Sequence, residues 1–313
     1  MKYQLASYSF RGGRPSNQDR VAIVERDNAV LLVVADGLGG HAGGEIAAEM
    51  LTQTMVRAFQ GIRQPVIARP SAFLALSILQ AHTAIQLYTR TQPPHMQPRT
   101  TCVACLIQNG YAYWAHVGDS RLYHFRDGRL RMRTQDHTPV EQLHQEGLLS
   151  DDEMGDHPSK GRLLKCVGGP NKPTIALGQE TVLLQNDTLL LCSDGVWETL
   201  SADDIVRYAT YADLDEGVEE MLRAVEKRTA GTSDNMTAAA LRWDDVMTSS
   251  LPLQGNEPVQ VDPKQLWENG TKWSADLKLQ SQAPPKDAPQ SLQSIEEQIR
   301  EIEQYMRKHE PRH

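Results

Sequence analysis

Three aspartates of this 313-residue chain stand where apolar runs end or begin. Asp36 follows the run LLVVA, Asp194 follows LLLCS, and Asp234 shortly precedes TAAALRW. Each of the three lies beside glycine or another turn-forming residue. An apolar strand holds a side chain at its end rigidly, and a neighbouring glycine lets the backbone or a ligand come close to it. Carboxylates that converge in this way repel one another unless a divalent cation lies between them. A single aspartate of this kind is usually a turn residue, so the three together suggest a metal site without specifying one.

Two further segments carry residues with possible chemistry. Asp119, in HVGDSRLY, is a fourth candidate carboxylate, although the same strand–turn–strand pattern also holds aspartates that only form the turn. The segment GLGGHAGGE after Asp36 could cradle a phosphate at the start of a helix. It lacks the lysine and spacing of a P-loop and the acidic residue of a dinucleotide fingerprint. A glycine-rich helix start is therefore the alternative interpretation.

The elements that must position these residues follow from hydrophobic periodicity. Asn109-Gly110 and Asp127-Gly128 are hairpin-turn signals. Strands come in groups with helices between or after them, which favours an α+β fold, with antiparallel sheets covered by helices, over a doubly wound parallel sheet. The predicted strands are Gln4–Ser9, Val21–Glu25, Val30–Ala35, Thr101–Ile107, Tyr111–Val117, Arg121–Arg126, Leu130–Arg133, Thr188–Cys192 and Thr237–Trp243, and the predicted helices are Glu45–Gln60, Ser71–Thr89 and Asp215–Thr229.

Composition divides the chain into three parts. Residues 1–243 are predicted to form one folded unit, and residues 244–290 form a proline-rich linker. Residues 291–309 return to helical periodicity as an amphipathic, coiled-coil-like helix that is too short to be stable alone. It is therefore expected to dock on its own domain, on its own copy or on a partner helix. Its a and d positions are Leu292, Ile295, Ile299, Ile302 and Met306.

Composition and net charge limit the kinds of protein that this chain could be. Hydrophobic residues make up 40% and charged residues 23% of the chain, as in soluble globular proteins. The net charge of −8 argues against a nucleic-acid partner and suits a site built from carboxylates. Neither a signal-peptide stretch nor a membrane-spanning run is found, so the expectation is a soluble, cytoplasmic protein without membrane contact.

The four cysteines are interpreted as thiols in a reducing compartment. Cys102 and Cys105 form a C-x-x-C pair, which could indicate zinc or redox chemistry. On a predicted strand, however, positions three apart point to opposite faces, and no second C-x-x-C completes four ligands. Buried or surface thiols are the preferred interpretation.

Seven segments occur in one order along the chain: RPSNQD, VADGLGGHAGGE, RTT, VGDSR, DHT, CSDGVWE and SDN. Each is weak alone, but together they are highly specific, and over about residues 4–243 the chain resembles the metal-dependent, type 2C (PPM) protein phosphatases in their bacterial form. The resemblance implies two antiparallel sheets packed as a sandwich with helices outside (αββα), in agreement with the pattern above. It also implies an enzyme that hydrolyses phosphoserine and phosphothreonine in proteins, opposing a bacterial serine/threonine kinase.

The resemblance implies a role for each matching position. Two Mg²⁺ or Mn²⁺ ions would share a water and aim it at phosphorus without a covalent phosphoenzyme. A flap at about residues 140–162 would help to choose substrates. Asp36 would bridge both ions, the Gly37 carbonyl would bind the second, Asp194 and Asp234 would complete the first, Asp119 with Asp194 would match a third metal position, Asp19 would act in the outer shell, Arg14 would hold the substrate phosphate, and Ser193 and Asn235 would support the carboxylates.

Two positions depart from the family pattern. Eukaryotic members have a histidine directly after Asp-Gly as the proposed acid, whereas Leu38 stands here. His41 lies nearby, as a candidate acid or as a structural histidine at a helix start, so the general acid is left open. Arg99 replaces the usual glycine before the Thr-Thr pair, which questions the turn there. A pseudophosphatase on the same fold, and a targeting protein acting through its tail, are the rival hypotheses.

Overall fold

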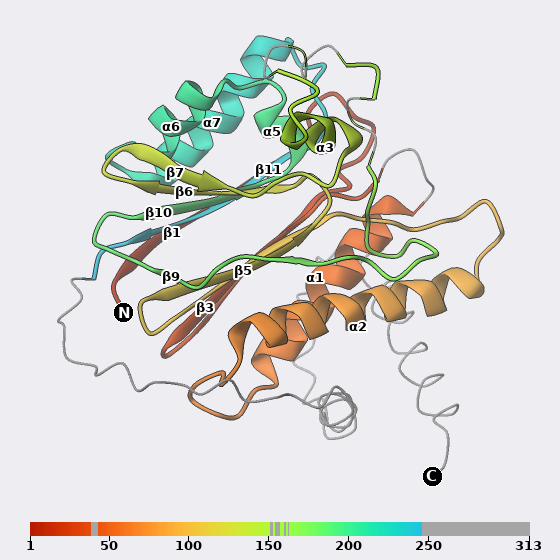
Figure 1. Cartoon of the computed structure of the whole chain (residues 1–313), viewed down its shortest axis with the longest axis horizontal. Coiled ribbons are helices and arrows are strands. Elements are labelled where there is room, and N and C mark those ends of the chain that lie inside the picture. Colours follow the sequence, from red (N-terminus) through yellow and green to blue (C-terminus); the bar gives the residue numbers. More distant parts are fainter. Residues whose placement is uncertain (39–42, 151–152, 154–156, 160, 162, 246–313) are drawn as a thin grey trace, which may run out of the picture.

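Two antiparallel β-sheets face each other in the computed structural model, and helices cover both outer faces (Figure 1). The structure describes residues 1–38, 43–150, 153, 157–159, 161 and 163–245. The predicted α+β sandwich is therefore confirmed. Apart from its first two residues, the predicted linker lies outside the described residues, as does the whole predicted helix 291–309.

The first sheet has the strand order β1–β11–β10–β6–β7. Its first and last strands in sequence pair along their whole length, from Tyr3 opposite Trp243 to Phe10 opposite Met236, which brings the two ends of residues 1–243 side by side. β10 lies at the centre and pairs with β11 and β6. The strands are β1 (Tyr3–Phe10), β6 (Arg121–Arg126), β7 (Arg129–Arg133), β10 (Thr188–Cys192) and β11 (Met236–Trp243).

The second sheet has the order β2–β3–β4–β5–β8, and β9 also pairs with β5. Asn109 and Gly110, between β4 and β5, have φ values of 54° and 78°, as a tight hairpin turn requires. Asp127 and Gly128 do the same between β6 and β7, so both predicted hairpins are confirmed. The strands are β2 (Arg20–Arg26), β3 (Ala29–Ala35), β4 (Cys102–Gln108), β5 (Tyr111–Val117), β8 (Ala176–Leu177) and β9 (Thr181–Val182).

Helices lie on both outsides of the sandwich (Figure 1). α1 (Gly44–Gln60) and α2 (Pro70–Arg90) cover the second sheet, and α7 (Leu214–Thr229) packs on β1 and β11 of the first. α5 (Asp194–Trp197) and α6 (Ala202–Ala209) lie beside α7, and α3 (Pro139–Gln145) follows β7. The three long helices match their predicted ranges to within a residue or so at each end.

The buried strands explain why several apolar runs do not alternate with polar residues. Every residue of β3 is buried, because the strand has the other sheet on one face and helices on the other. Val30, Leu32 and Val34 face the other sheet, and the residues between them face α1 and α2. Cys102 and Cys105 of β4 follow the same rule and face opposite layers as free, buried thiols, which confirms their predicted placement.

The short elements were not predicted. β8, β9, α3, α5 and α6 have two to eight residues each, too few to show a clear period in the sequence. They form because neighbours supply hydrogen bonds; β8, for example, adds to β5 through Ala176 opposite His116. No helix of the described residues is both long enough and apolar enough to cross a membrane.

Candidate metal centre

The predicted aspartates gather at one end of the sandwich, where strands of both sheets end. Asp36 follows β3 of the second sheet, and Asp194 follows β10 of the first. Because β10 and β11 are antiparallel, the end of β10 lies beside the start of β11, just after Asp234. Asp119 lies in the connection from β5 to β6, which passes from one sheet to the other. The fold thus brings together carboxylates that are far apart in sequence.

The pKa shifts of these carboxyl groups reflect their burial and their closeness to one another. Burial raises the pKa of Asp36 well above its usual range, and the negative charges of Asp194, Asp19 and Asp119 raise it further. Burial also raises the pKa of Asp194, with Asp119 as the largest charge effect. The pKa is raised to about 7 for Asp119 and to about 6 for Asp19, chiefly by burial. A divalent cation among them would relieve this repulsion.

Hydrogen bonds from the Thr-Thr pair fix the backbone of Asp36. The Asp36 N–H donates to Thr101 Oγ1 at 3.0 Å. The Asp36 carbonyl accepts from the Thr101 N–H at 2.8 Å and from Thr100 Oγ1 at 2.9 Å. The Leu38 N–H donates to the Arg99 carbonyl at 3.0 Å, so Arg99 in place of glycine leaves this connection formed. The RTT segment therefore holds the predicted bridging ligand.

Two glycines permit the close approaches on which the site depends. A Cβ on Gly37 would lie 2.4 Å from the carbonyl oxygen of Gly44, at the start of α1. A Cβ on Gly195 would lie 2.1 Å from the carbonyl oxygen of Asn235. Real side chains do not approach so closely, so only glycine lets α5, with Asp194 at its first position, press against the Asp234 segment.

Asp19 is held inside the protein by a chain of hydroxyl groups. Ser193 Oγ donates to the Asp19 carboxylate at 2.7 Å and accepts the Thr237 N–H at 3.0 Å. The Thr237 hydroxyl also shares a hydrogen bond of 2.7 Å with Ser9. Asp19 and Ser193 are both buried. This placement is consistent with the supporting role predicted for Ser193.

Asn235 joins the segment RPSNQD to the start of β11. Its amide oxygen accepts the Gln18 N–H at 2.9 Å, and its amide nitrogen donates to the carbonyls of Arg11 and Ser16 at 2.7 and 3.0 Å. These bonds cross more than 200 residues of sequence. Asn235 therefore fixes the loop that carries Arg14 against the loop that carries Asp234.

Arg14 is paired with one of the predicted metal ligands. Its Nε donates to Asp234 Oδ1 at 2.7 Å, and its terminal NH2 group donates to Oδ2. The Arg14 side chain is 55% exposed and that of Asp234 is 37% exposed. A pair this exposed opens at little cost in free energy. In the metal-free protein the guanidinium therefore offsets a charge that a cation would otherwise offset.

Asp119 offers an acceptor without a partner. Its Oδ1 is buried and has no hydrogen bond within the described residues, a costly arrangement unless a ligand completes it. Its carbonyl accepts the Trp197 indole N–H at 3.0 Å. The Arg121 guanidinium lies 3.5 Å above the same indole and binds Asp136 through two nitrogens. The residues that hold Asp119 in place, Arg121, Asp136 and Trp197, were not singled out from the sequence, although each lies within a quoted motif.

Within the part of the chain that the structure describes, no three acidic, histidine or cysteine side chains already stand as a ready metal site. Two of the carboxylates are turned to protein partners, Asp234 to Arg14 and Asp19 to Ser193. The carboxylates are nonetheless close enough to raise one another's pKa. Rotation of side chains on fixed strands would gather them, and an all-oxygen donor set fits Mg²⁺ or Mn²⁺ better than zinc.

Some predicted positions fall outside the described residues. His41, the candidate acid or helix-start residue, is one of them, and so is part of the predicted flap at residues 140–162. The described start of that segment forms α3, which Thr138 caps by accepting the Glu141 N–H at 3.2 Å.

Comparison with known proteins agrees with this geometry. A sequence model described as Protein phosphatase 2C matches residues 10–241. The serine/threonine phosphatase stp of Listeria welshimeri is 33% identical over 186 residues, 58% of this chain and 73% of that protein. The solved serine/threonine phosphatase of S. agalactiae is 28% identical, with a TM-score of 0.71 over 78% of this chain and 100% of that one.

A second solved relative was determined with metal. The catalytic domain of the serine/threonine protein phosphatase PstP, in complex with two manganese ions, is 27% identical, with a TM-score of 0.66 over 78% of this chain and 99% of that one. Since the family model spans most of the folded unit and both sheets match those of solved relatives, the chain belongs to the protein phosphatase 2C family.

Proposed function

We propose that this protein hydrolyses phosphoserine and phosphothreonine in other proteins, with two Mg²⁺ or Mn²⁺ ions held by Asp36, the Gly37 carbonyl, Asp194 and Asp234. The observation that carries the proposal is the cluster of carboxylates, in which Asp194, Asp19 and Asp119 raise the pKa of Asp36, and Asp119 raises that of Asp194. When bound, the cations would supply a nucleophilic water and offset the charge on the phosphoryl oxygens. Membership of a metal-dependent phosphatase family supports this assignment.

The ligands themselves have distinct tasks in this proposal. The backbone of Asp36 is fixed by Thr100 and Thr101, and its carboxylate is affected by the charges of the other aspartates, so we assign it as the bridge between two cations. Asp194 and Asp234 reach the same space from the first sheet. Two manganese ions are bound by the related PstP domain, which supports the same number here.

Asp119 and Asp19 are proposed to extend the site. The unpartnered Oδ1 of Asp119 and the neighbouring Asp194 would hold a third cation. Asp19, fixed by Ser193, would accept hydrogen bonds from the water shell of the cations. Ser193 and Asn235 would keep their loops in place rather than touch substrate.

Arg14 is proposed to bind the substrate phosphate. Its guanidinium matches two phosphate oxygens in geometry, and its exposed pair with Asp234 opens readily. A cation on Asp234 would replace the charge that Arg14 supplies in the metal-free protein. Arg14 would then turn from the carboxylate to the phosphate.

The test is hydrolysis of a phosphothreonine peptide by the full chain, measured with and without Mn²⁺. We expect turnover only with metal, and its loss in Asp194→Asn but not in Asp203→Asn, an exposed carboxylate of α6. Turnover by metal-free protein, or wild-type turnover by Asp194→Asn at saturating Mn²⁺, would refute the proposal. A purely binding pseudophosphatase would show no turnover under any of these conditions.

The physiological substrates are proposed to be a bacterial serine/threonine kinase and its targets. The phosphatases that this chain resembles act on phosphorylated serine and threonine, as their names state. The predicted helix 291–309 is proposed to serve association and to be dispensable for chemistry. Deletion of residues 251–313 should leave turnover within about a few-fold, and light scattering of both forms tests for self-association.

A further inference from the structure

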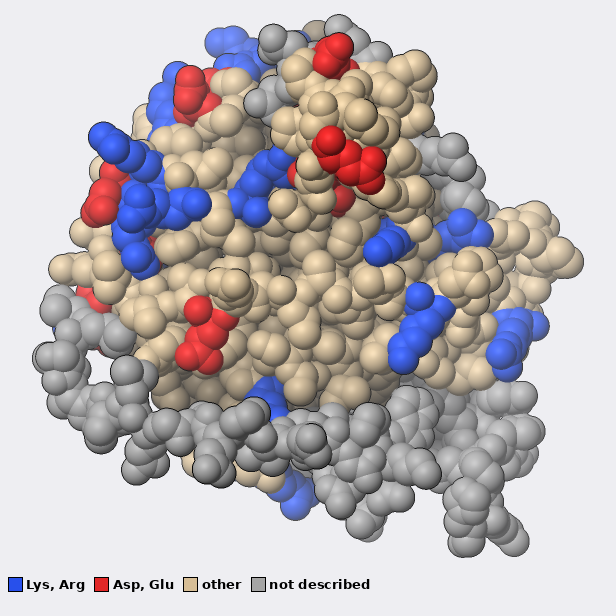
Figure 2. Space-filling model, viewed as in Figure 1, with Lys and Arg blue, Asp and Glu red and all other residues tan. Residues whose placement is uncertain are grey.

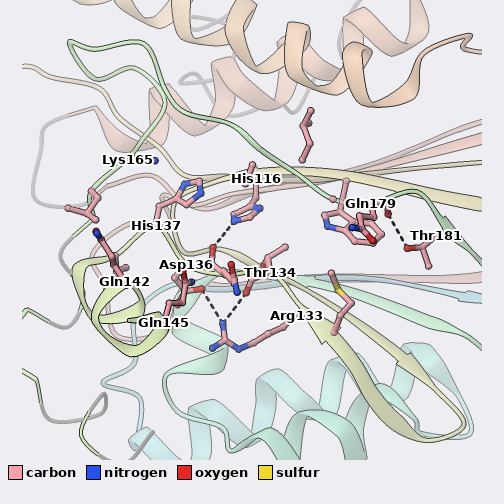
Figure 3. A pocket seen from close by; sticks show the side chains of 18 residues that line it. His116, Arg133, Thr134, Asp136, His137, Gln142, Gln145, Lys165, Gln179 and Thr181 are labelled. Atoms are coloured by element: carbon pink, nitrogen blue, oxygen red, sulfur yellow. Dashed lines mark hydrogen bonds and ion pairs between the residues drawn. The ribbon is translucent and has the colours of Figure 1, made fainter. Parts of the chain in front are cut away.

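A pocket of about 570 Å³ opens beside the carboxylate cluster and shares none of its aspartates. One wall comes from β5 and β8, and the other from β7, residues 134–138 and α3 (Figure 3). It lies between the two sheets on the face seen in Figure 1. On the same face, Figure 2 shows basic side chains gathered over the β6–β7 hairpin and a largely uncharged middle. Neither Arg14 nor any proposed metal ligand lines this pocket.

Two stacked imidazoles line its inner end. The rings of His116 and His137 are parallel to within 25°, with centroids 4.7 Å apart. Nε2 of His116 donates to the Gln135 carbonyl at 2.8 Å, so Nδ1 is left as an acceptor. His116 is 5% exposed, and this Nδ1 has no partner within the described residues. A ligand with an N–H donor, such as a peptide backbone, would satisfy it.

The second imidazole, His137, offers a hydrogen-bond donor where His116 offers an acceptor. Nδ1 of His137 accepts the Gly118 N–H at 3.2 Å, so its hydrogen is on Nε2. Burial, together with the smaller effects of His116 and Lys165, lowers the pKa of His137 to about 4, so the ring is neutral near pH 7. His137 therefore brings a hydrogen-bond donor to the pocket but no charge.

The charges of the lining do not cancel. Asp136 is neutralised by Arg121 through bonds of 2.9 and 2.7 Å. Arg133 is neutralised by Glu141 at 3.1 Å. Lys165 also lines the pocket, at the same end as His137 and Gln142 in Figure 3, and it has no carboxylate partner within the described residues. This end of the pocket therefore favours an anionic group.

The pocket is near enough to the metal centre for one substrate chain to reach both. His137 binds the backbone of Gly118, the residue before Asp119. One bonded neighbour and one side chain separate the pocket from the cluster, a distance on the order of 10 Å. An extended peptide advances about 3.3 Å per residue, so about two to four residues would span the gap.

We propose that this pocket binds an acidic side chain of the substrate polypeptide, a few residues from the phosphorylated residue. The carboxylate would pair with Lys165, with His137 and Gln142 as hydrogen-bond donors beside it. The substrate backbone would donate to His116 Nδ1, and the neighbouring substrate residues would extend along the pocket toward Trp114 and Leu177. This inference rests on the proposed phosphatase activity and adds a sequence preference to it.

The experiment compares peptides that differ at one position. A phosphothreonine peptide with alanine on both sides is the parent, and glutamate or glutamine is placed at each of the five positions before and after the phosphothreonine. We expect glutamate at one position, and not glutamine, to raise kcat/KM by about tenfold through KM, as a charge-assisted contact would. p-Nitrophenyl phosphate, which lacks a peptide chain, measures the metal centre alone.

Variants of Lys165 assign the preference to the pocket. In Lys165→Gln the glutamate preference should disappear while turnover of p-nitrophenyl phosphate and of the parent peptide persists. In Lys165→Glu a lysine at the same peptide position should become favoured. Lys227→Gln, an exposed lysine of α7 that does not line the pocket, is the matched control and should behave as wild type.

Each outcome decides the matter. Equal kcat/KM for all wild-type peptides, or an unchanged glutamate preference in Lys165→Glu, would overturn the inference while leaving the phosphatase activity established. A parallel loss of p-nitrophenyl phosphate turnover in Lys165→Gln would also overturn it, because Lys165 would then serve the metal centre. If no substrate were hydrolysed by the wild type at all, the proposed function itself would fail first.

Discussion

Strand β10 has an aspartate just beyond each end, and the two carboxylates have opposite surroundings. Asp187, before the strand, accepts two bonds from the Arg126 guanidinium, at 2.8 and 2.6 Å, and one from the Leu184 N–H at 2.9 Å. His124 Nε2 lies 3.0 Å away but is not aligned for a hydrogen bond. Asp194, after the strand, faces the charges of Asp119 and other acidic groups.

Burial raises the pKa of the aspartate at both ends of β10, but the neighbouring groups act in opposite directions. Burial alone raises the pKa of Asp187, but Arg126, His124 and the Leu184 N–H together outweigh it and bring the pKa to about 2. Burial also raises the pKa of Asp194, and the neighbouring carboxylates raise it further. One end of β10 is therefore neutralised within the chain, whereas the carboxylate at the other end has no such partner charge within the described residues. On the proposed function, Asp187 stabilises the fold and Asp194 binds a cation.

The comparison predicts the largest effect for Asp194→Asn. Turnover should fall by about a thousandfold or more, because a metal ligand is lost. The metal-free variant should unfold no more readily than the wild type, since one of several repelling charges has gone. Kinetics at saturating Mn²⁺ and denaturant unfolding in EDTA measure the two quantities. A destabilised metal-free variant would show that Asp194 is a structural carboxylate like Asp187.

Metal should stabilise the protein against unfolding by binding at the Asp194 end of β10 and not at the Asp187 end. At a free Mn²⁺ concentration about 100-fold above Kd, the free energy of unfolding should rise by about 2.7 kcal/mol. Thermal unfolding with Mn²⁺ and with EDTA tests this without any activity measurement. The same rise is expected in Asp187→Asn, and a smaller one in Asp194→Asn. Equal rises in both variants would mean that the cation binds elsewhere.

Asp187→Asn should affect stability and leave chemistry intact. The depressed pKa of Asp187 corresponds to about 2 kcal/mol of folding free energy above pH 4. Because the folded pKa lies below the ordinary value, this contribution is lost as pH falls from about 4 to about 2. Urea unfolding of wild type and variant should therefore differ at pH 7 and converge at pH 2. The kcat of the folded variant should match that of the wild type.

The exposed pair between Arg14 and Asp234 should give the smallest change in stability. Arg14→Gln is expected to alter the free energy of unfolding by less than about 1 kcal/mol, because both side chains are partly in water. The KM for a phosphopeptide should nevertheless rise several-fold, since a phosphate contact is lost. Arg207→Gln, which removes another exposed pair, serves as the control and should leave KM unchanged. A wild-type KM in Arg14→Gln would exclude the proposed contact.

Short-range patterns in the sequence were enough to predict the long strands and helices and two hairpin turns. The run VLLVVA was enough to predict a strand, and Asn109-Gly110 and Asp127-Gly128 were enough to predict hairpin turns, because these properties depend on neighbouring residues. The same locality placed Asp36 and Asp194 at the ends of strands. The seven motifs together then indicated the phosphatase family and, with it, the αββα fold. That residues 246–313 contribute a linker and a helix stays a prediction.

Tertiary structure alone decided how the site is put together. Arg14 and Asp234 are 220 residues apart, and no pattern in the sequence indicates that one neutralises the other. The bonds from Thr101 to Asp36 and from Ser193 to Asp19 likewise join distant segments. Whether a buried aspartate is neutralised, like Asp187, or repelled, like Asp194, depends on which charges the folded chain brings within a few ångströms. The sequence determines the carboxylates and the strands that carry them, and only their arrangement in space determines which of them are left without a compensating charge.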